Sequence, residues 1–346
     1  MTMIGLLSRC SSALVIVVAP VALAACSGPE PAAPPPTTSS ISPVAEQTRR
    51  PVERRPVTDA ATTVREISVA GRTRSYRLRA SPAPVDDPGR PLALVLHGKG
   101  GSAEEMERHS GLNAVADAAG VALAYLEGVD EGWSASPKPT ELRPDPAADV
   151  DFARAVVDEL TDVAQVDPDH VYAVGLSEGG IMALRLAAEH PDWFAAVASV
   201  AGQLPGPPAE VRPTGPVPVL SIYGDADPLR PIGGLVDVPP GTPVIGKEPP
   251  KPTLSTAETV EAFCRVGDAD ERRHEELPAT ATPDGTSLSR DSCTNPDSGL
   301  RVVSITVHGG GHTWPGGTFP HRPSTVGVTS GQLSAADTVV DFLLGD

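Results

Sequence analysis

Residues Val171 to Ala188 join two apolar runs of different character through the turn Gly175-Leu176-Ser177-Glu178-Gly179. The first run is rich in β-branched and aromatic residues and is typical of a buried parallel strand. The second run is rich in Ala and Leu and favours a helix that stops near His190 and Pro191. Glycines on both sides of Ser177 allow a sharp reversal that leaves its hydroxyl clear of bulky side chains. The pattern predicts a nucleophilic serine on a strand–turn–helix unit; a Gly/Ser turn without chemistry is the alternative.

Strand-like and helix-like stretches alternate through the rest of the chain. Residues 62–69 and 72–79 flank Ala70-Gly71 and predict an antiparallel hairpin, because so short a turn allows no crossover. Further strands are expected at residues 92–96, 121–126, 171–174, 195–200, 217–223 and 300–307, and helices at about 103–119, 149–163, 178–190 and 334–344. This alternation predicts an α/β fold with a mostly parallel central sheet, helices on both faces and an N-terminal antiparallel hairpin.

The N-terminus has the features of a lipoprotein signal. Arg9 precedes an apolar stretch at residues 13–25, and Leu23-Ala24-Ala25 places small residues directly before Cys26. We expect residues 1–25 to be a signal peptide, Cys26 to be lipidated and residues 26–60 to form a Pro-rich disordered tether. The protein would then be exported, and lipid-anchored at the outer face of the cytoplasmic membrane or released. An uncleaved anchor and an ordinary secretory signal are the alternatives.

The charge balance limits the classes of partner. The chain of 346 residues contains 27 Lys and Arg against 44 Asp and Glu, which gives a formal net charge of −17. Such acidity argues against nucleic acid as a partner and would repel polyanionic substrates at long range. Neutral esters would be unaffected.

Four cysteines divide between processing and folding. Cys10 lies in the expected signal peptide and Cys26 at the expected lipid site, which leaves Cys264 and Cys293 in the folded part. Outside the cytoplasm these two are expected to form a disulfide. It would close a charge-rich excursion at residues 268–290 that has few apolar residues to hold it in place. Two buried free thiols are the alternative.

A nucleophilic serine needs two partners. A serine hydroxyl attacks a carbonyl carbon at neutral pH when a histidine accepts its proton and a carboxylate orients that histidine. His312 closes a glycine-rich stretch just past the strand expected at 300–307 and is the expected base, whereas His308 is expected to pack or to hydrogen-bond. Asp227 is the expected acid, and Asp225 is expected to cap the turn. This chemistry requires no cofactor, and no cluster of His and Cys predicts a metal site.

The negatively charged oxygen of the tetrahedral intermediate needs two N–H donors. We expect them to be the backbone N–H groups of Glu178 and Lys99, with His97 bracing the loop that carries Lys99. Two Pro-rich stretches, 225–256 and 134–146, are expected to cover or flank the site. Trp133 and Trp314 are expected in site loops, where they would line an acyl or sugar subsite or else be part of the core.

Four motifs carry a resemblance from about Ser75 to the C-terminus: Leu96-His97-Gly98, Gly175 to Met182, Gly224 to Pro228, and Gly310-Gly311-His312-Thr313-Trp314-Pro315-Gly316-Gly317. With them the chain resembles the polyhydroxybutyrate depolymerase family, which is similar to feruloyl and acetylxylan esterases of the α/β-hydrolase superfamily. The resemblance implies that residues 61–346 form an esterase domain with Ser177, Asp227 and His312 as its triad. It also implies an acyl-enzyme intermediate and an ester substrate.

The chain departs from this family at two points. Lys99 stands where such sequences often have a small residue or cysteine, and no appended domain for binding solid polymer is recognisable, which disfavours crystalline polyester. A serine peptidase of the same fold and an inactive envelope-associated binding lipoprotein are the alternative functions. The sequence specifies no oligomeric state.

Overall fold

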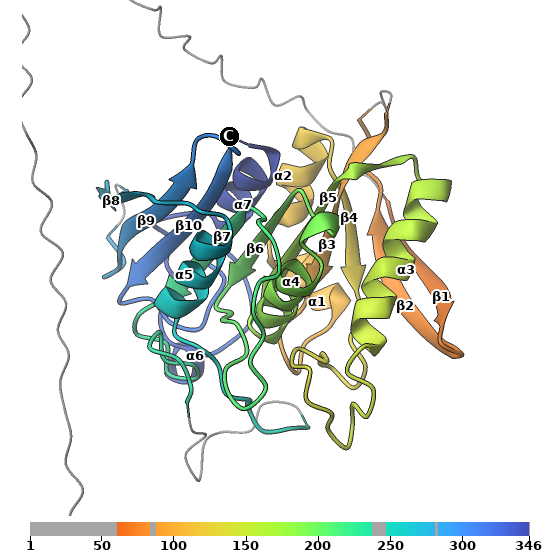
Figure 1. The fold of residues 1–346 in the computed structure, drawn as a ribbon, viewed down its shortest axis with the longest axis horizontal. Coiled ribbons are helices and arrows are strands. Elements are labelled where there is room, and N and C mark those ends of the chain that lie inside the picture. Colours follow the sequence, from red (N-terminus) through yellow and green to blue (C-terminus); the bar gives the residue numbers. More distant parts are fainter. Residues whose placement is uncertain (1–60, 84–87, 237–246, 281–282, 346) are drawn as a thin grey trace, which may run out of the picture. The chain divides into compact units, whose positions relative to one another are not determined.

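A ten-stranded mixed sheet runs through the part of the chain that the computed structural model describes, residues 61–83, 88–236, 247–280 and 283–345 (Figure 1). All of these residues belong to one unit, Glu53–Asp346. The expected signal peptide, Cys26 and the whole tether expected at 26–60 lie outside the described residues. Within the described ranges, no helix is long and apolar enough to span a bilayer.

The strand order across the sheet is β1-β2-β4-β3-β5-β6-β7-β10-β9-β8. The strands are β1 (Thr62–Val69), β2 (Arg72–Arg79), β3 (Arg90–Leu96), β4 (Ala122–Leu126), β5 (Val166–Leu176), β6 (Ala196–Val200), β7 (Val219–Gly224), β8 (Glu271–Leu277), β9 (Ser287–Asn295) and β10 (Leu300–His308). The six central strands, from β4 to β10, are parallel, and β2 pairs antiparallel with β4. The carboxyl ends of the six parallel strands therefore meet at one edge of the sheet, where residues from distant parts of the sequence can converge.

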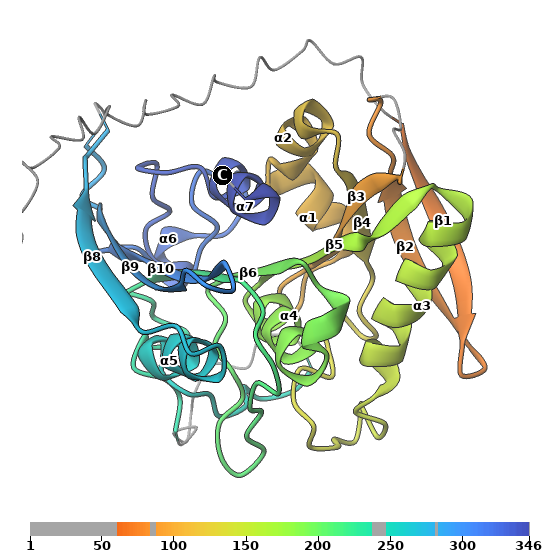
Figure 2. The ribbon, with the colours of Figure 1, turned by 45° about the horizontal axis from the view of Figure 1, so that its top comes forward.

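Helices cover both faces of this sheet (Figure 2). α1 (Ala103–His109), α2 (Leu112–Ala119) and α7 (Ala335–Leu344) pack on one face, and α3 (Ala148–Val163), α4 (Glu178–Glu189) and α5 (Thr256–Val266) pack on the other. Each face has its own core, because successive side chains on a strand point to opposite sides. On β3, for example, Leu94 and Leu96 enter one core while Ala93 and Val95 enter the other. The predicted α/β-hydrolase fold is confirmed.

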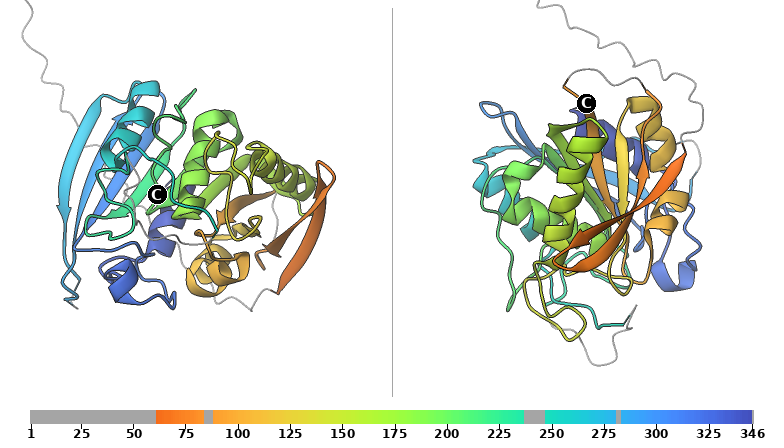
Figure 3. Two further views of the ribbon diagram at one scale, coloured as in Figure 1. Left: turned by 90° about the horizontal axis from the view of Figure 1, so that it is seen from below. Right: turned by 90° about the vertical axis from the view of Figure 1, so that its right-hand side faces the viewer.

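The charge-rich excursion is regular structure rather than a loosely held loop. β8 and β9 extend the sheet as antiparallel strands beyond β10, at the end opposite the β1–β2 hairpin (Figure 3). These strands need few apolar residues because an edge hairpin can expose one face to water. Cys264 on α5 and Cys293 on β9 form a disulfide, with a Cα–Cα distance of 6.1 Å, which ties the edge of the sheet to the helix beneath it.

The single helix expected at 103–119 is two helices. Gly111 adopts a left-handed φ of 78° between α1 and α2, a conformation that glycine adopts without steric cost. A further helix, α5, was not expected; Ser255 and Glu258 form a reciprocal capping box at its start. A short helix, α6 (Pro323–Val326), follows the His312 loop.

Candidate active site

Ser177 lies at the sharp turn between β5 and α4. Its backbone has φ 55° and ψ −119°, a strained combination for a residue with a side chain. A Cβ atom on Gly179 would lie 2.3 Å from the Leu96 carbonyl oxygen, and one on Gly175 would lie 2.1 Å from the carbonyl carbon of Gly179. The two glycines are therefore required by backbone contacts within the turn and with β3. The turn presents the Ser177 hydroxyl at the carboxyl edge of the sheet.

His312 connects Ser177 to Asp227 through two hydrogen bonds. Its Nε2 lies 2.7 Å from Ser177 Oγ, and its Nδ1 lies 2.5 Å from Asp227 Oδ2. Because a carboxylate only accepts, Nδ1 carries the proton and Nε2 is free to accept one from the serine. The other carboxylate oxygen, Oδ1, accepts the backbone N–H groups of Leu229 at 2.7 Å and Arg230 at 2.8 Å. Asp227 is thereby held in one orientation.

Backbone contacts fix the loops that carry the acid and the base. The Ala226 N–H donates to the Gly310 carbonyl at 3.0 Å, and the His312 N–H donates to the Val326 carbonyl at 2.6 Å. A Cβ on Gly311 would lie 2.1 Å from the same Val326 carbonyl oxygen, so this close approach excludes any side chain there. The loops after β7 and β10 are adjacent because these strands are parallel neighbours.

A second set of Ser, His and Asp side chains lies beside the first. His308 Nδ1 donates to Asp225 Oδ2 at 2.8 Å, and His308 Nε2 lies 2.8 Å from Ser289 Oγ. Asp225 also accepts the Gly309 N–H, so it joins the two loops rather than capping its own turn. Ser289 lies within β9, paired with strands on both sides, and has neither a sharp turn nor a helix N-terminus beside it. A hydrogen-bonded Ser, His and Asp set is therefore not sufficient: of the two sets found among the described residues, that of Ser177 also has the sharp turn and lines the cavity.

The expected oxyanion donors lie next to Ser177. Glu178 is the first residue of α4, so its N–H has no acceptor within that helix. A Cβ on Gly98 would lie 3.5 Å from the Ser177 Cβ, which places the loop that carries Lys99 against the nucleophile. The Lys99 ammonium lies 3.7 Å from Glu178 Oε1. The backbones of Glu178 and Lys99 thus both lie beside Ser177.

His97 braces the Lys99 loop from below. Its Nδ1 donates to the Gly98 carbonyl at 2.8 Å, and its Nε2 accepts the Gly128 N–H at 3.0 Å. The ring is almost fully buried and packs 4.9 Å from the Trp133 ring. Only neutral imidazole can make both hydrogen bonds, because Nε2 must have a free lone pair.

Burial lowers the pKa of His97 below its usual value of 6.5, although Glu127, Glu178 and Glu105 act in the opposite direction. The unfolded chain then binds more protons than the folded one as the pH falls through 6.5. We expect the free energy of unfolding to decrease over that range. Denaturant unfolding between pH 7.5 and 5 checks this, with His97→Gln as the comparison. Equal pH slopes in both proteins would remove His97 as the cause.

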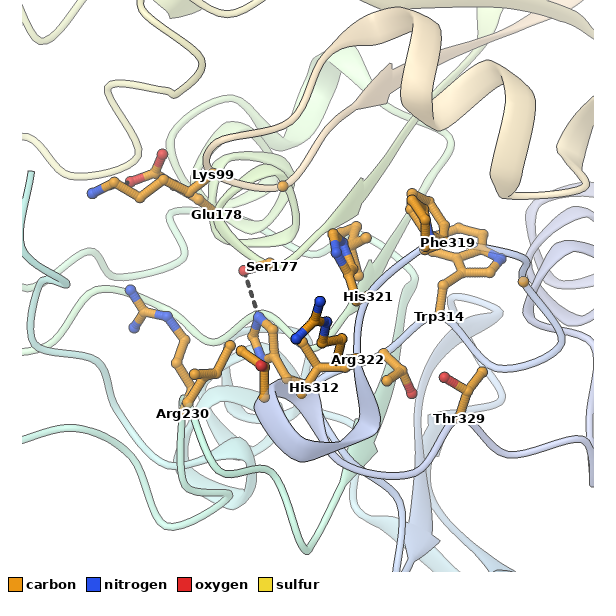
Figure 4. Close-up of a pocket in the computed structure, with 18 of the residues that line it drawn as sticks. Lys99, Ser177, Glu178, Arg230, His312, Trp314, Phe319, His321, Arg322 and Thr329 are labelled. Carbon is orange, nitrogen blue, oxygen red and sulfur yellow. Dashed lines mark hydrogen bonds and ion pairs between the residues drawn. The ribbon is translucent and has the colours of Figure 1, made fainter. Parts of the chain in front are cut away.

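A cavity of about 370 Å³ opens over Ser177 (Figure 4). Its lining includes Lys99, Glu178 and His312, together with residues that the sequence analysis did not predict: Leu229, Arg230, Pro250, Phe319, His321 and Arg322. Pro250 shows that the Pro-rich stretch 225–256 does reach the site. The stretch 134–146 does not line this cavity; Ser136, Lys138 and Thr140 line a second one that shares Pro250. The stretch 134–146 therefore lies beside the cavity over Ser177 without lining it.

Trp133 and Trp314, the two tryptophans expected in site loops, have different roles. Trp314 is 1% exposed yet lines the cavity. Trp133 is fully buried outside it and donates its indole N–H to the His97 carbonyl at 2.8 Å. The prediction that Trp133 lines a subsite was wrong; the indole instead supports the loop behind the oxyanion donors.

The chain matches known proteins at several levels. It is 75% identical over 346 residues to "Putative esterase NocK" of Nocardia uniformis subsp. tsuyamanensis, which covers 99% of this chain and 100% of that protein. The chain belongs to the same esterase family. Residues 148–204, which contain the Ser177 turn, match the prolyl oligopeptidase family.

A further sequence match and a solved structure are similar to the chain at lower identity. Feruloyl esterase B of Piromyces equi is 27% identical over 234 residues, which cover 65% of this chain and 40% of that protein. The solved structure of an acetyl xylan esterase from Aspergillus awamori superposes with a TM-score of 0.51 and 13% identity, over 82% of this chain and all of that one. At this identity the likeness concerns the fold.

Proposed function

We propose that the protein is a serine carboxylic ester hydrolase in which Ser177, His312 and Asp227 act as the catalytic triad. The observation that carries the proposal is the continuous hydrogen-bonded path from Ser177 Oγ through His312 to Asp227, at the mouth of a cavity. Membership of an esterase family supports it.

In the first half-reaction Ser177 Oγ attacks the ester carbonyl carbon while its proton passes to His312 Nε2. Asp227 stabilises the imidazolium that forms. The N–H groups of Glu178 and Lys99 bind the oxyanion of the tetrahedral intermediate. His312 then protonates the departing alkoxide, which leaves an acyl group on Ser177.

The second half-reaction reverses these roles. Water attacks the acyl carbon while His312 Nε2 accepts its proton, and the proton is then returned to Ser177 Oγ as the carboxylic acid departs. Every proton is supplied by the serine or by water, so the triad needs no cofactor for this cycle. The natural substrates we propose are hydroxyalkanoate oligomers or feruloyl and acetyl esters, in line with the sequence resemblance.

A peptidase activity is the second candidate, because residues 148–204 match the prolyl oligopeptidase family. That match covers α3, β5, the Ser177 turn, α4 and β6, which are the elements that present a nucleophile in either class of enzyme. It does not include Asp227, His312 or the lining after β10. The lipid anchor expected at Cys26 lies outside the described residues and stays a prediction from the sequence.

Labelling with a fluorophosphonate probe tests the proposal. The wild-type protein should be labelled and should hydrolyse para-nitrophenyl butyrate, whereas Ser177→Ala should do neither, because the probe requires an activated serine. Ser289→Ala is the matched control: it removes the hydroxyl of the second Ser–His–Asp set and should retain labelling. Loss of labelling in Ser289→Ala but not in Ser177→Ala would reverse the assignment. Absent labelling of folded wild type would favour a binding protein.

A further inference from the structure

The cavity over Ser177 has a charge opposite to that of the chain as a whole. Its lining contains three basic side chains, Lys99, Arg230 and Arg322, against a single carboxylate, Glu178. Figure 4 shows the guanidinium groups of Arg230 and Arg322 on either side of the Ser177–His312 hydrogen bond. A chain with net charge −17 has thus concentrated positive charge at the nucleophile.

Arg230 is the most informative of these cations. It is only 7% exposed, and within the described part of the chain its guanidinium makes one hydrogen bond, a long one of 3.3 Å from Nη1 to the Lys251 carbonyl. Among the described residues no carboxylate forms an ion pair with it. A guanidinium presents five N–H donors in a planar fork, so most of its donors are left for a ligand.

The nearby carboxylates are already engaged elsewhere. Asp227 uses Oδ2 for His312 and Oδ1 for two backbone N–H groups. Glu178 has Oε1 3.7 Å from the Lys99 ammonium and accepts the Trp133 N–H at Oε2, 3.1 Å away. The carboxylates of Asp227 and Glu178 therefore both interact with donors other than the Arg230 guanidinium.

Burying an unpaired charge costs several kcal/mol, and the guanidinium stays ionised at any physiological pH. Such a cost is tolerable when a ligand completes the pair, and the geometry of the fork matches the two oxygens of a carboxylate. A neutral ester would leave the Arg230 guanidinium without an anionic partner, as it is in the free protein.

We propose that the site is selective for esters that carry a carboxylate on their acyl or alcohol part, and that Arg230 binds this carboxylate, with Arg322 at the rim of the same cavity. The inference rests on the proposed esterase function and narrows its substrate class. Arg230 lies three residues after Asp227 on the loop after β7, and its backbone N–H donates to Asp227 Oδ1, so the acid that orients the base and the cation that binds the substrate are positioned by the same segment.

Two matched pairs of substrates test the proposal. The acyl pair is para-nitrophenyl hydrogen adipate and para-nitrophenyl hexanoate; the alcohol pair is para-acetoxybenzoate and para-tolyl acetate. In at least one pair the wild-type kcat/KM should be about tenfold or more higher for the charged member, the effect of one charge-assisted hydrogen-bonded pair. Arg230→Met should reduce this ratio to about one, and Arg230→Lys should give a value between. The pair that responds identifies which part of the ester carries the charge.

Arg272→Met is the control, since it removes the same charge from the exposed strand β8, where Arg272 pairs with Glu261. It should leave the charged-to-neutral ratio at the wild-type value. No preference in either pair for the wild type would overturn the proposal. So would a ratio that falls in Arg322→Met or Arg272→Met but not in Arg230→Met.

An inhibition experiment on the wild-type protein tests the proposal without requiring any variant to fold. Hexanoate should inhibit the hydrolysis of para-nitrophenyl butyrate at concentrations about tenfold lower than hexanamide, which has the same chain and no charge. Equal inhibition would contradict the proposal. Failure of the proposed esterase function is separate, because it appears as absent hydrolysis of all four esters by the wild type or as hydrolysis of the neutral esters by Ser177→Ala.

Discussion

Replacing Asp227 by asparagine should lower kcat for ester hydrolysis by about four orders of magnitude and leave the fold intact. Asparagine Oδ1 can still accept the N–H groups of Leu229 and Arg230, so the loop after β7 keeps its conformation. The amide nitrogen would face His312 Nδ1, however, and would donate to it. His312 would then carry its proton on Nε2 and could no longer accept one from Ser177.

Asp225→Asn is the matched control for this prediction. It removes the same charge two residues away, at a carboxylate that binds His308 and the Gly309 N–H rather than His312. We expect kcat to fall by less than about tenfold, through a slight loosening of the two loops. Steady-state kinetics on a para-nitrophenyl ester and circular dichroism spectra of both variants provide the comparison. A greater loss at Asp225 would mean that the acid has been assigned to the wrong residue.

Replacing both Cys264 and Cys293 by alanine should lower the free energy of unfolding by about 3.5 kcal/mol and the melting temperature by roughly 5–10 °C. The disulfide closes a loop with a sequence separation of 29 residues, and its loss restores the conformational entropy of that loop to the unfolded chain. Both sulfur atoms are fully buried, and alanine avoids placing unpaired hydroxyl groups there.

Activity should respond differently from stability in this variant. The disulfide joins α5 to β9, and neither cysteine lines the cavity over Ser177. Ester turnover well below the melting temperature should therefore be close to that of the wild type. Thermal melts followed by circular dichroism, together with assays at 25 °C, check both parts. An unchanged melting temperature, or inactivation of a fully folded variant, would contradict this account of the cross-link.

Local sequence patterns predicted the central sheet and the Ser177 turn. Apolar runs of strand length are readable because a parallel strand buried on both faces must be apolar throughout. The Gly175 and Gly179 positions are readable because only glycine fits the backbone contacts of that turn. The order of Ser177, Asp227 and His312 along the chain could be anticipated because the carboxyl ends of parallel strands meet at one edge, and the structure places the three side chains within hydrogen-bonding distance there.

The strands β8 and β9, which lie beyond β10, were not readable in this way. β8, with the sequence Glu-Arg-Arg-His-Glu-Glu-Leu, is largely exposed and carries no apolar alternation. Its strand conformation comes from backbone pairing with β9, a contact between segments that sequence patterns do not connect.

Sequence patterns alone identified the residue types of a nucleophilic site and the strand–loop units on which they lie. Which side chains surround that site became clear from the three-dimensional arrangement. Asp225, His308 and Ser289 form a similar set that does not line the cavity over Ser177, Trp133 lies behind the site rather than in it, and Arg230 reaches the cavity from a position just past the Gly224–Pro228 motif. The physical reason is that the direction of a loop side chain follows from packing against distant segments, whereas a buried strand or a glycine turn is constrained by its own backbone.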